Sequence, residues 1–169
     1  MNLSTRTYTL ILFGAILWCA AIVLAPLVAS SGSPSAEYLY RFFQPICHQR
    51  GERSFFLFEH KLGVCTRCTS VYCAFLAGVL VYPFVRGLRN LCVPPRSVLL
   101  LALAPITVEV ATEWVGWYSS SPFTRSLTGA LLGFVLAFTI LPVALEAVQQ
   151  IADRRAADCS SIINKSSKQ

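Results

Sequence analysis

Residues 8–29 read YTLILFGAILWCAAIVLAPLVA and contain no charged side chain. A helix of about 20 apolar residues is long enough to span the hydrocarbon core of a bilayer. The stretch therefore predicts a transmembrane helix. Its length favours retention as an anchor over removal as a signal peptide, although Ala25 to Ala29 leave room for that second interpretation.

Three further apolar stretches, at about 69–85, 97–118 and 126–145, predict three more spans. The first of these is short, so we expect it to take an additional turn from the residues before it. The fold class is then an all-α integral membrane protein with four transmembrane helices. We expect one four-helix domain over residues 1–151 and a polar, disordered tail over 152–169.

Composition leads to the same class. Of the 169 residues, 55% are hydrophobic and 13% are charged, whereas soluble domains carry about 25% charged residues. The net charge of +6 then indicates membrane topology and contact with anionic lipid rather than nucleic-acid binding. Eight Lys and Arg residues fall on the side of the termini and six on the other, which predicts an inner (cytoplasmic) membrane protein with both termini cytoplasmic.

The loop between the first two spans, about residues 30–68, is long and partly apolar. Ser33, Pro34 and Glu37 resemble a helix start, and apolar residues then recur at helical spacing. The aromatic run 54–58 is too short to span the membrane and too apolar to lie in water. We expect two short helices in this loop, amphipathic or re-entrant, at the mouth of the bundle.

Cysteines are concentrated in this loop and at its end. Cys47 and His48 are adjacent, and Cys65 and Cys68 follow with two residues between them. This spacing allows two sulfurs to bind one tetrahedral ion, with Cys47 or His48 completing the ligand set. Zinc or another transition metal is therefore one hypothesis. A redox-active pair at a helix N-terminus, favoured by Arg67, is the second, and a structural disulfide or buried thiols is the third.

The third predicted span carries two carboxylates, Glu109 and Glu113, on one helical face. Burying a carboxylate in a membrane is costly unless it is paired, protonated or bound to metal, so this face should point into the bundle. Arg67, Arg125 and Arg50 are the available counter-charges. A catalytic or proton-transfer role for Glu109, Glu113, Arg67 and Arg125 is one interpretation, and solvation of Glu113 with a structural Glu109 is the other.

Gly129 and Gly133 lie four residues apart in the fourth predicted span. Small residues at this spacing let helix backbones approach closely in lipid. They predict a helix contact, unless they reflect only the tolerance of membrane helices for glycine.

These motifs together resemble a family of small bacterial and archaeal polytopic membrane proteins of unknown function. The matching residues are Cys47-His48-Gln49, Arg53-Ser54-Phe55, Gly63 to Thr69, Tyr72, Gly78, Pro105, Glu109, Arg125, Thr128, Gly129 and Gly133. The chain departs from the family at Glu109-Val110, where aspartate and glycine are usual, and at Ser70, where glycine is usual. The resemblance implies no activity, but it implies that the Cys/His group and the carboxylates form one site.

Three functions follow as hypotheses. The first is a Cys/His metal site at the membrane face, acting on a lipid-borne substrate. The second is a quinone-linked thiol oxidoreductase using Cys65 and Cys68, and the third is a non-catalytic scaffold or transporter subunit. A lipid-like or quinone ligand and a homo-oligomer are compatible with all three, and whether the protein is an enzyme stays open.

Overall fold

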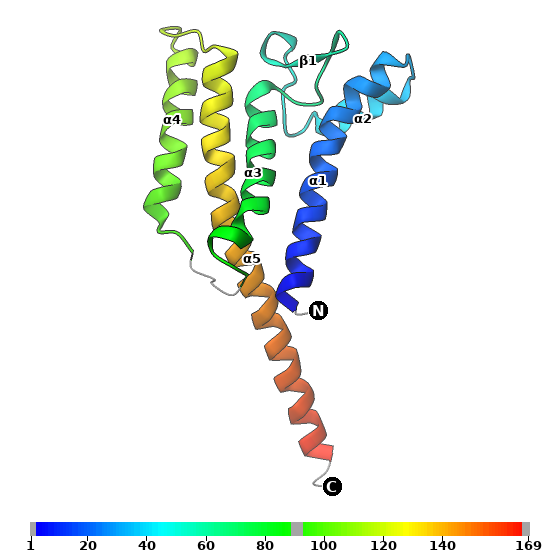
Figure 1. The fold of residues 1–169 in the computed structure, drawn as a ribbon, viewed down its shortest axis with the longest axis vertical. Helices are drawn as coiled ribbons and strands as arrows, with labels where there is room; N and C mark the ends of the chain where they lie inside the picture. Colours follow the sequence, from blue (N-terminus) through cyan, green and yellow to red (C-terminus); the bar gives the residue numbers. More distant parts are fainter. Residues whose placement is uncertain (1–2, 89–92, 167–169) are drawn as a thin grey trace.

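Four long helices form a bundle in the computed structural model, which describes residues 3–88 and 93–166, with side chains as far as Arg155. They are α1 (Leu3–Ser30), α3 (Thr66–Val85), α4 (Arg96–Trp114) and α5 (Pro122–Ser166) (Figure 1). All four contain stretches long and apolar enough to cross a membrane. The predicted all-α, four-span fold is confirmed.

The helix ends differ in detail from those predicted. Helix α3 begins at Thr66, which supplies the additional turn that its short apolar stretch needs. Helix α4 ends at Trp114, because Gly116 turns the chain with a φ of +79°. Helix α5 begins at Pro122, since the Ser121 hydroxyl accepts the Thr124 N–H at 3.2 Å and proline suits the first helical position.

Helix α5 is longer than the predicted fourth span, and the expected disorder of residues 152–169 stays a prediction. Helix α5 continues to Ser166, and Figure 1 shows it extending well beyond the end of the other helices. After Pro142 the chain contains no glycine or proline. Nothing in the sequence therefore breaks the helix once the fourth span has nucleated it.

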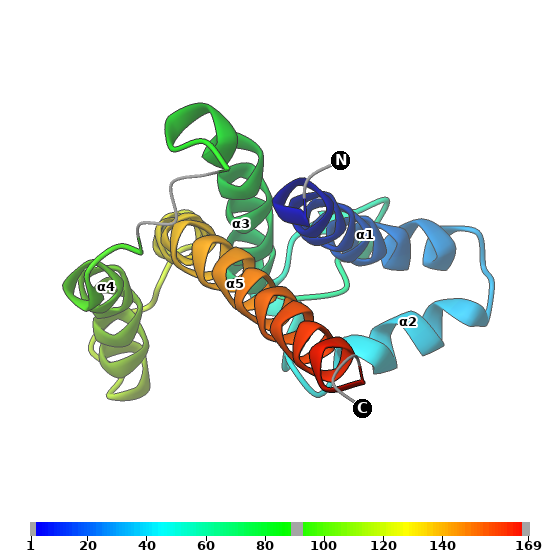
Figure 2. The same ribbon diagram turned by 90° about the horizontal axis from the view of Figure 1, so that it is seen from below.

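Helix α5 lies between α4 on one side and α3 and α1 on the other (Figure 2). The predicted glycine contact is confirmed. An added Cβ at Gly129 would lie 2.6 Å from the Arg67 carbonyl oxygen, and one at Gly133 would lie 2.1 Å from the Val71 carbonyl oxygen. The backbones of α3 and α5 are therefore in direct contact.

Two prolines within helices each leave one carbonyl group without its helical hydrogen bond, and another part of the chain donates to that carbonyl instead. Pro26 cannot donate to the Ile22 carbonyl, which instead accepts the N–H of Gly63 at 3.2 Å. Pro83 likewise leaves the Val79 carbonyl to the Tyr8 hydroxyl, at 3.2 Å. Such partners are needed in lipid, where water cannot satisfy the backbone.

The loop before α3 folds against the end of the bundle. It contains α2 (Ser35–Phe43), a 3₁₀ turn (Gly51–Arg53) and the strands β1 (Phe56–Leu57) and β2 (His60–Lys61). The first predicted short helix is therefore present, but the aromatic run 54–58 enters a hairpin rather than a second helix. Positive φ values at Phe58 and Glu59 give the tight turn that joins two antiparallel strands.

A small apolar core holds this loop in place. Phe43 and Val64 are fully buried against Ile22 of α1, together with Cys47 and Leu62. The loop lies at the opposite end of the bundle from the start of α1 and the end of α5 (Figure 1). Its residues are therefore fixed at one face of the bundle.

Gly133→Ala is expected to destabilise the protein, because its methyl group would overlap the α3 backbone and overpacking costs about 1–3 kcal/mol. Thermal unfolding of the purified protein in detergent, followed by size-exclusion chromatography, should show a lower midpoint. Gly14→Ala is the control, since nothing lies within 4 Å of its added Cβ. Equal midpoints for both variants would contradict the close contact.

Candidate functional site

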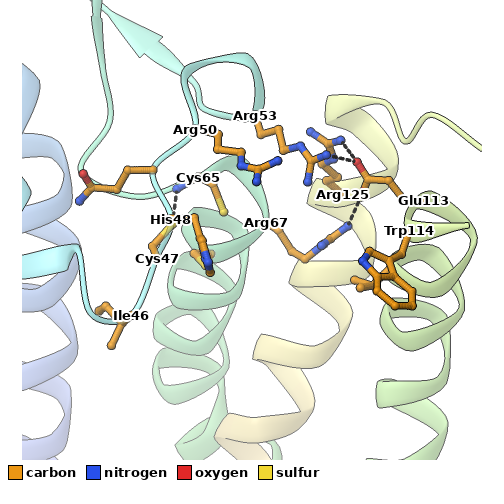
Figure 3. Close-up of a pocket in the computed structure, with 13 residues that line it drawn as sticks. Ile46, Cys47, His48, Arg50, Arg53, Cys65, Arg67, Glu113, Trp114 and Arg125 are labelled. Atoms are coloured by element: carbon orange, nitrogen blue, oxygen red, sulfur yellow. Dashed lines mark hydrogen bonds and ion pairs between the residues drawn. The ribbon is translucent and has the colours of Figure 1, made fainter. Parts of the chain in front are cut away.

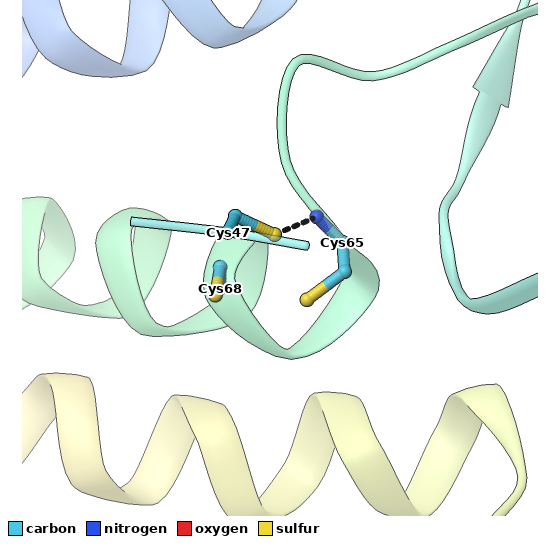
Figure 4. Close-up of side chains that lie close together, drawn as sticks. All are labelled: Cys47, Cys65 and Cys68. Carbon is cyan, nitrogen blue, oxygen red and sulfur yellow. Dashed lines mark hydrogen bonds between the residues drawn. The ribbon is translucent and has the colours of Figure 1, made fainter. Parts of the chain in front are cut away.

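Three cysteines meet where the loop joins α3. Cys65 is the residue before the helix, Cys68 lies in its first turn, and Cys47 comes from the segment after α2. Their three Sγ atoms all lie within 4.8 Å of one another. The Cys65 N–H donates to the Cys47 Sγ at 3.1 Å, as Figure 4 shows. Cys47 thus forms one sulfur cluster with two cysteines that lie 18 and 21 positions further along the chain.

Polar contacts in the loop fix Cys47 in this position. The neighbouring Gln49 has a left-handed backbone, with a φ of 48°. Its side-chain amide donates to the carbonyls of Tyr40, at 2.7 Å, and Gly63, at 2.9 Å. It therefore ties the segment after α2 to the segment before α3, a role for Gln49 that the sequence analysis did not identify.

The electrostatics of the cluster favour a thiolate at Cys65. Its pKa is lowered to about 5, first because the Cys68 thiol donates a hydrogen bond to its sulfur, and further by the Cys68 backbone and by Cys47, while burial opposes the shift. The N-terminus of α3 points at the same place. Thiolates are the form in which cysteine binds metals and attacks disulfides, so the cluster suits either chemistry.

His48 lies beside the cluster but outside its ligand group. Its side chain is exposed, and the group of ligand atoms close enough to share an ion contains only the three sulfurs. Three sulfurs with one open position are a recognised zinc arrangement, because zinc takes four tetrahedral ligands. A ligand role for His48 stays a prediction.

The carboxylates of α4 lie in a network of arginines from three other segments. Glu113 accepts from Arg125 of α5 at 2.6 Å and from Arg53 of the loop at 2.8 Å, both through Oε1. Arg67 of α3 lies 3.2 Å from Glu109 Oε2 and 3.9 Å from Glu113 Oε2. The structure thus brings together the four charged residues that the sequence singled out, Glu109, Glu113, Arg67 and Arg125.

Two hydroxyl groups complete the network. Thr128 donates to Glu109 Oε2 at 2.7 Å, and the Ser120 hydroxyl accepts from Arg125 Nε at 2.7 Å. Arg53 and Ser120 were not predicted as site residues. The match of Arg53-Ser54-Phe55 to the family could have indicated Arg53, whereas no pattern marks Ser120. Only the placement of the loop and of the turn before α5 brings them to the carboxylates.

A cavity of about 430 Å³ joins the sulfur cluster to the arginine network. Figure 3 shows the arginines between the cysteines and Glu113. Glu109, which pairs with Arg67, does not line the cavity. The lining residues are Ile46, Cys47, His48, Gln49, Arg50, Arg53, Cys65, Arg67, Cys68, Val110, Glu113, Trp114 and Arg125.

Buried polar atoms next to the cavity lack hydrogen-bond partners. They are Nε and Nη2 of Arg67 and Oε1 of Glu109, although Arg67 Nη2 is within ion-pair distance of Glu109. An unsatisfied buried polar group is costly and calls for a further partner. The interior of the site is therefore polar, charged and incompletely satisfied.

Comparison with known sequences places the chain in a family. The profile described as "Predicted membrane protein (DUF2085)" matches residues 47–139, which include the three clustered cysteines and the four charged residues. The chain belongs to this family of predicted membrane proteins. This description names no activity.

Two archaeal relatives are similar over much of the chain. "Uncharacterized protein MJ1492" of Methanocaldococcus jannaschii is 35% identical over 149 residues, covering 85% of this chain and 96% of the relative. An uncharacterized protein of Methanothermobacter thermautotrophicus is 32% identical over 95 residues, covering 56% and 84%. No solved structure matches. Function must therefore be argued from the site.

Glu113→Gln is expected to lower the free energy of unfolding by about 3 kcal/mol, because removing one partner of a buried ion pair leaves the others uncompensated. Denaturant or thermal unfolding in detergent would measure the loss. Glu37→Gln is the matched control, since the Glu37–Arg41 pair on α2 is exposed at both ends and should change stability by less than about 1 kcal/mol. Similar losses in both variants would contradict a buried network.

Proposed function

We propose that the protein binds a transition metal, zinc being the best fit, through Cys47, Cys65 and Cys68 at one face of the membrane, and acts there on a lipid-borne substrate. The observation that carries the proposal is the convergence of the three Sγ atoms within 4.8 Å. Thiolate sulfur is a preferred zinc ligand, and sulfurs bound to one tetrahedral zinc ion lie about 4 Å apart.

The donor set suits a reactive site as well as a structural one. Three protein ligands leave a fourth position for water, substrate or His48. Cys47, His48, Cys65 and Cys68 all line the cavity, so this position would face the cavity. Zinc, when bound, supplies a Lewis acid that activates water or polarises a carbonyl or phosphoryl oxygen.

The charged residues would orient the substrate opposite the thiols. Arg67, Arg125 and Glu113 line the cavity, and Glu109 does not. Arg53 and Arg125 hold Glu113 through the same oxygen, which favours a carboxylate that positions arginines over one that transfers protons. Glu109 would act as a positioning residue for Arg67.

Metal content gives a direct test. Protein purified in detergent without added metal is expected to carry about one equivalent of zinc by inductively coupled plasma mass spectrometry. Cys65→Ser should lose most of it, because one of three thiolate ligands is gone. Cys73→Ser is the control, since Cys73 is exposed on α3 and outside the cluster. His48→Ala lowers metal affinity only if its imidazole fills the fourth position.

A membrane thiol oxidoreductase is the second candidate, favoured by the position of Cys65 and Cys68 at the start of α3. An apolar cavity of about 380 Å³, lined by Trp18 and Tyr72 among others, lies next to this cluster, because both aromatic residues pack against the same core as Cys65 and Cys68. In this function the two thiols would form a disulfide and pass two electrons and two protons to a quinone, giving the quinol.

Thiol counting distinguishes the two candidates. The metal function would be overturned in favour of the redox one if the protein contains no metal and a soluble quinone converts the free thiols of Cys65 and Cys68 reversibly into a disulfide. Stoichiometric zinc with thiols inert to quinone would overturn the redox function. Both measurements use the same preparation.

We also propose that the protein lies in the cytoplasmic membrane with both termini in the cytoplasm. The excess of Lys and Arg on the side of the termini supports this orientation, which would place the cavity at the outer face. An alkaline phosphatase fused after Gln169 should be inactive in intact cells, and one inserted at Gly32 in the exposed turn after α1 should be active. The reverse result would invert the topology.

A further inference from the structure

Guanidinium groups outnumber carboxylates around the cavity. Arg50, Arg53, Arg67 and Arg125 line it, against the single lining carboxylate Glu113. Adding Glu109, which pairs with Arg67, leaves two guanidinium groups in excess of the carboxylates, and one positive charge in excess once the Cys65 thiolate is counted. A partly buried excess of positive charge is unfavourable unless an anion enters.

The arginines differ in how many of their guanidinium donors already have partners in the protein. Arg125 is buried, and Glu113 and Ser120 already accept hydrogen bonds from its guanidinium group. Arg50 is exposed and forms none of the ion pairs found among residues 3–88 and 93–155. It is therefore free to meet a ligand at the mouth of the cavity.

Arg67 supplies a free donor at the inner end. Its Nε atom is buried and lacks a hydrogen-bond partner, its Nη2 atom pairs with Glu109 at 3.2 Å, and its side chain lines the cavity. A guanidinium presents its donors as a planar fork that matches the oxygens of a phosphate group. Figure 3 shows Arg50 and Arg67 both lying between the thiols and Glu113.

On the α4 side, two apolar side chains of the cavity lining face outward. Val110 and Trp114 of α4 line it and are 43% and 91% exposed. In a bilayer these side chains contact lipid near the helix end, where tryptophan marks the interface. A ligand with a charged head and an apolar chain therefore fits both parts of the wall.

We propose that this cavity binds a phosphate monoester, carried on a membrane lipid, with Arg50 and Arg67 as the residues that contact the phosphate. A phosphate monoester presents three unesterified acceptor oxygens, which can meet both guanidinium groups, whereas a diester presents only two. This inference names the substrate class of the proposed function, and it rests on that function for the choice of the cavity. Binding of the phosphate itself requires only the arginines.

Isothermal titration of the full-length protein in nonionic detergent at low salt tests the proposal. The probes are dihexanoyl phosphatidic acid, dihexanoyl phosphatidylcholine and inorganic phosphate. Phosphatidic acid is expected to bind saturably, and Arg50→Gln should weaken it about tenfold, the loss typical for a hydrogen bond to a charged group. Arg67→Lys, which keeps the charge beside Glu109 but loses the fork, should weaken it similarly.

Arg96→Gln is the control variant, because Arg96 is exposed at the far end of α4. Inorganic phosphate binding as tightly as phosphatidic acid supports the phosphate site and assigns it to free phosphate rather than lipid. Phosphatidylcholine binding equally well, or both arginine variants binding like the wild type, would overturn the proposal.

Metal content separates this test from that of the proposed function. Arg50→Gln should retain the zinc of the wild type while losing affinity for phosphatidic acid. Cys65→Ser should lose zinc while keeping arginine-dependent binding. Absence of zinc from every preparation, with phosphate binding intact, would reject the metal function alone, and normal zinc with no arginine-dependent binding would reject the phosphate site alone.

Discussion

Two carboxylates on one face of α4 impose the main constraint on this membrane protein. A charge on a membrane helix is unfavourable unless another group neutralises it, and Glu113 is neutralised by Arg125 of α5 and Arg53 of the loop. Glu109 is paired with Arg67 of α3. The contacts of Arg53 and Arg67 join α4 to the loop and to α3, from which α5 separates it (Figure 2). The same arginines then form one wall of the cavity, so that the requirement for charge neutrality also builds the site.

The wall of the cavity that carries the cysteines is held in place by hydrogen bonds to backbone carbonyl groups. Pro26 frees the Ile22 carbonyl for Gly63, and Gln49 bridges the segments on either side of the hairpin. Together with the core around Phe43 and Val64, these contacts place Cys47 above the start of α3, where its sulfur meets the Cys65 N–H. A thiol cluster built this way is preorganised, because no helix has to move for the three sulfurs to approach one another. That rigidity is suited to a metal ion and equally to fast exchange between thiols.

Much of the architecture was predictable because membrane helices leave strong local signals. Apolar stretches of about 20 residues specify spans, and the spacing of Gly129 and Gly133 indicated the contact with α3 that the structure confirms. The two-residue gap between Cys65 and Cys68 already places both sulfurs on one turn. The hairpin in the loop and the long continuation of α5 were not predicted, because a two-residue ladder has almost no periodicity and a polar helix has no apolar face to reveal it.

The sequence alone determined the fold class, the number of spans and the residue types able to carry chemistry, since these depend on composition and on spacing within single helices. Only the tertiary structure decided that the cysteines and the arginine network share one cavity, that Arg53 reaches Glu113, and that His48 lies outside the sulfur cluster. The reason is physical: local patterns fix the faces of each helix, whereas the contacts of a long loop depend on buried hydrogen bonds and packing between segments far apart in the chain.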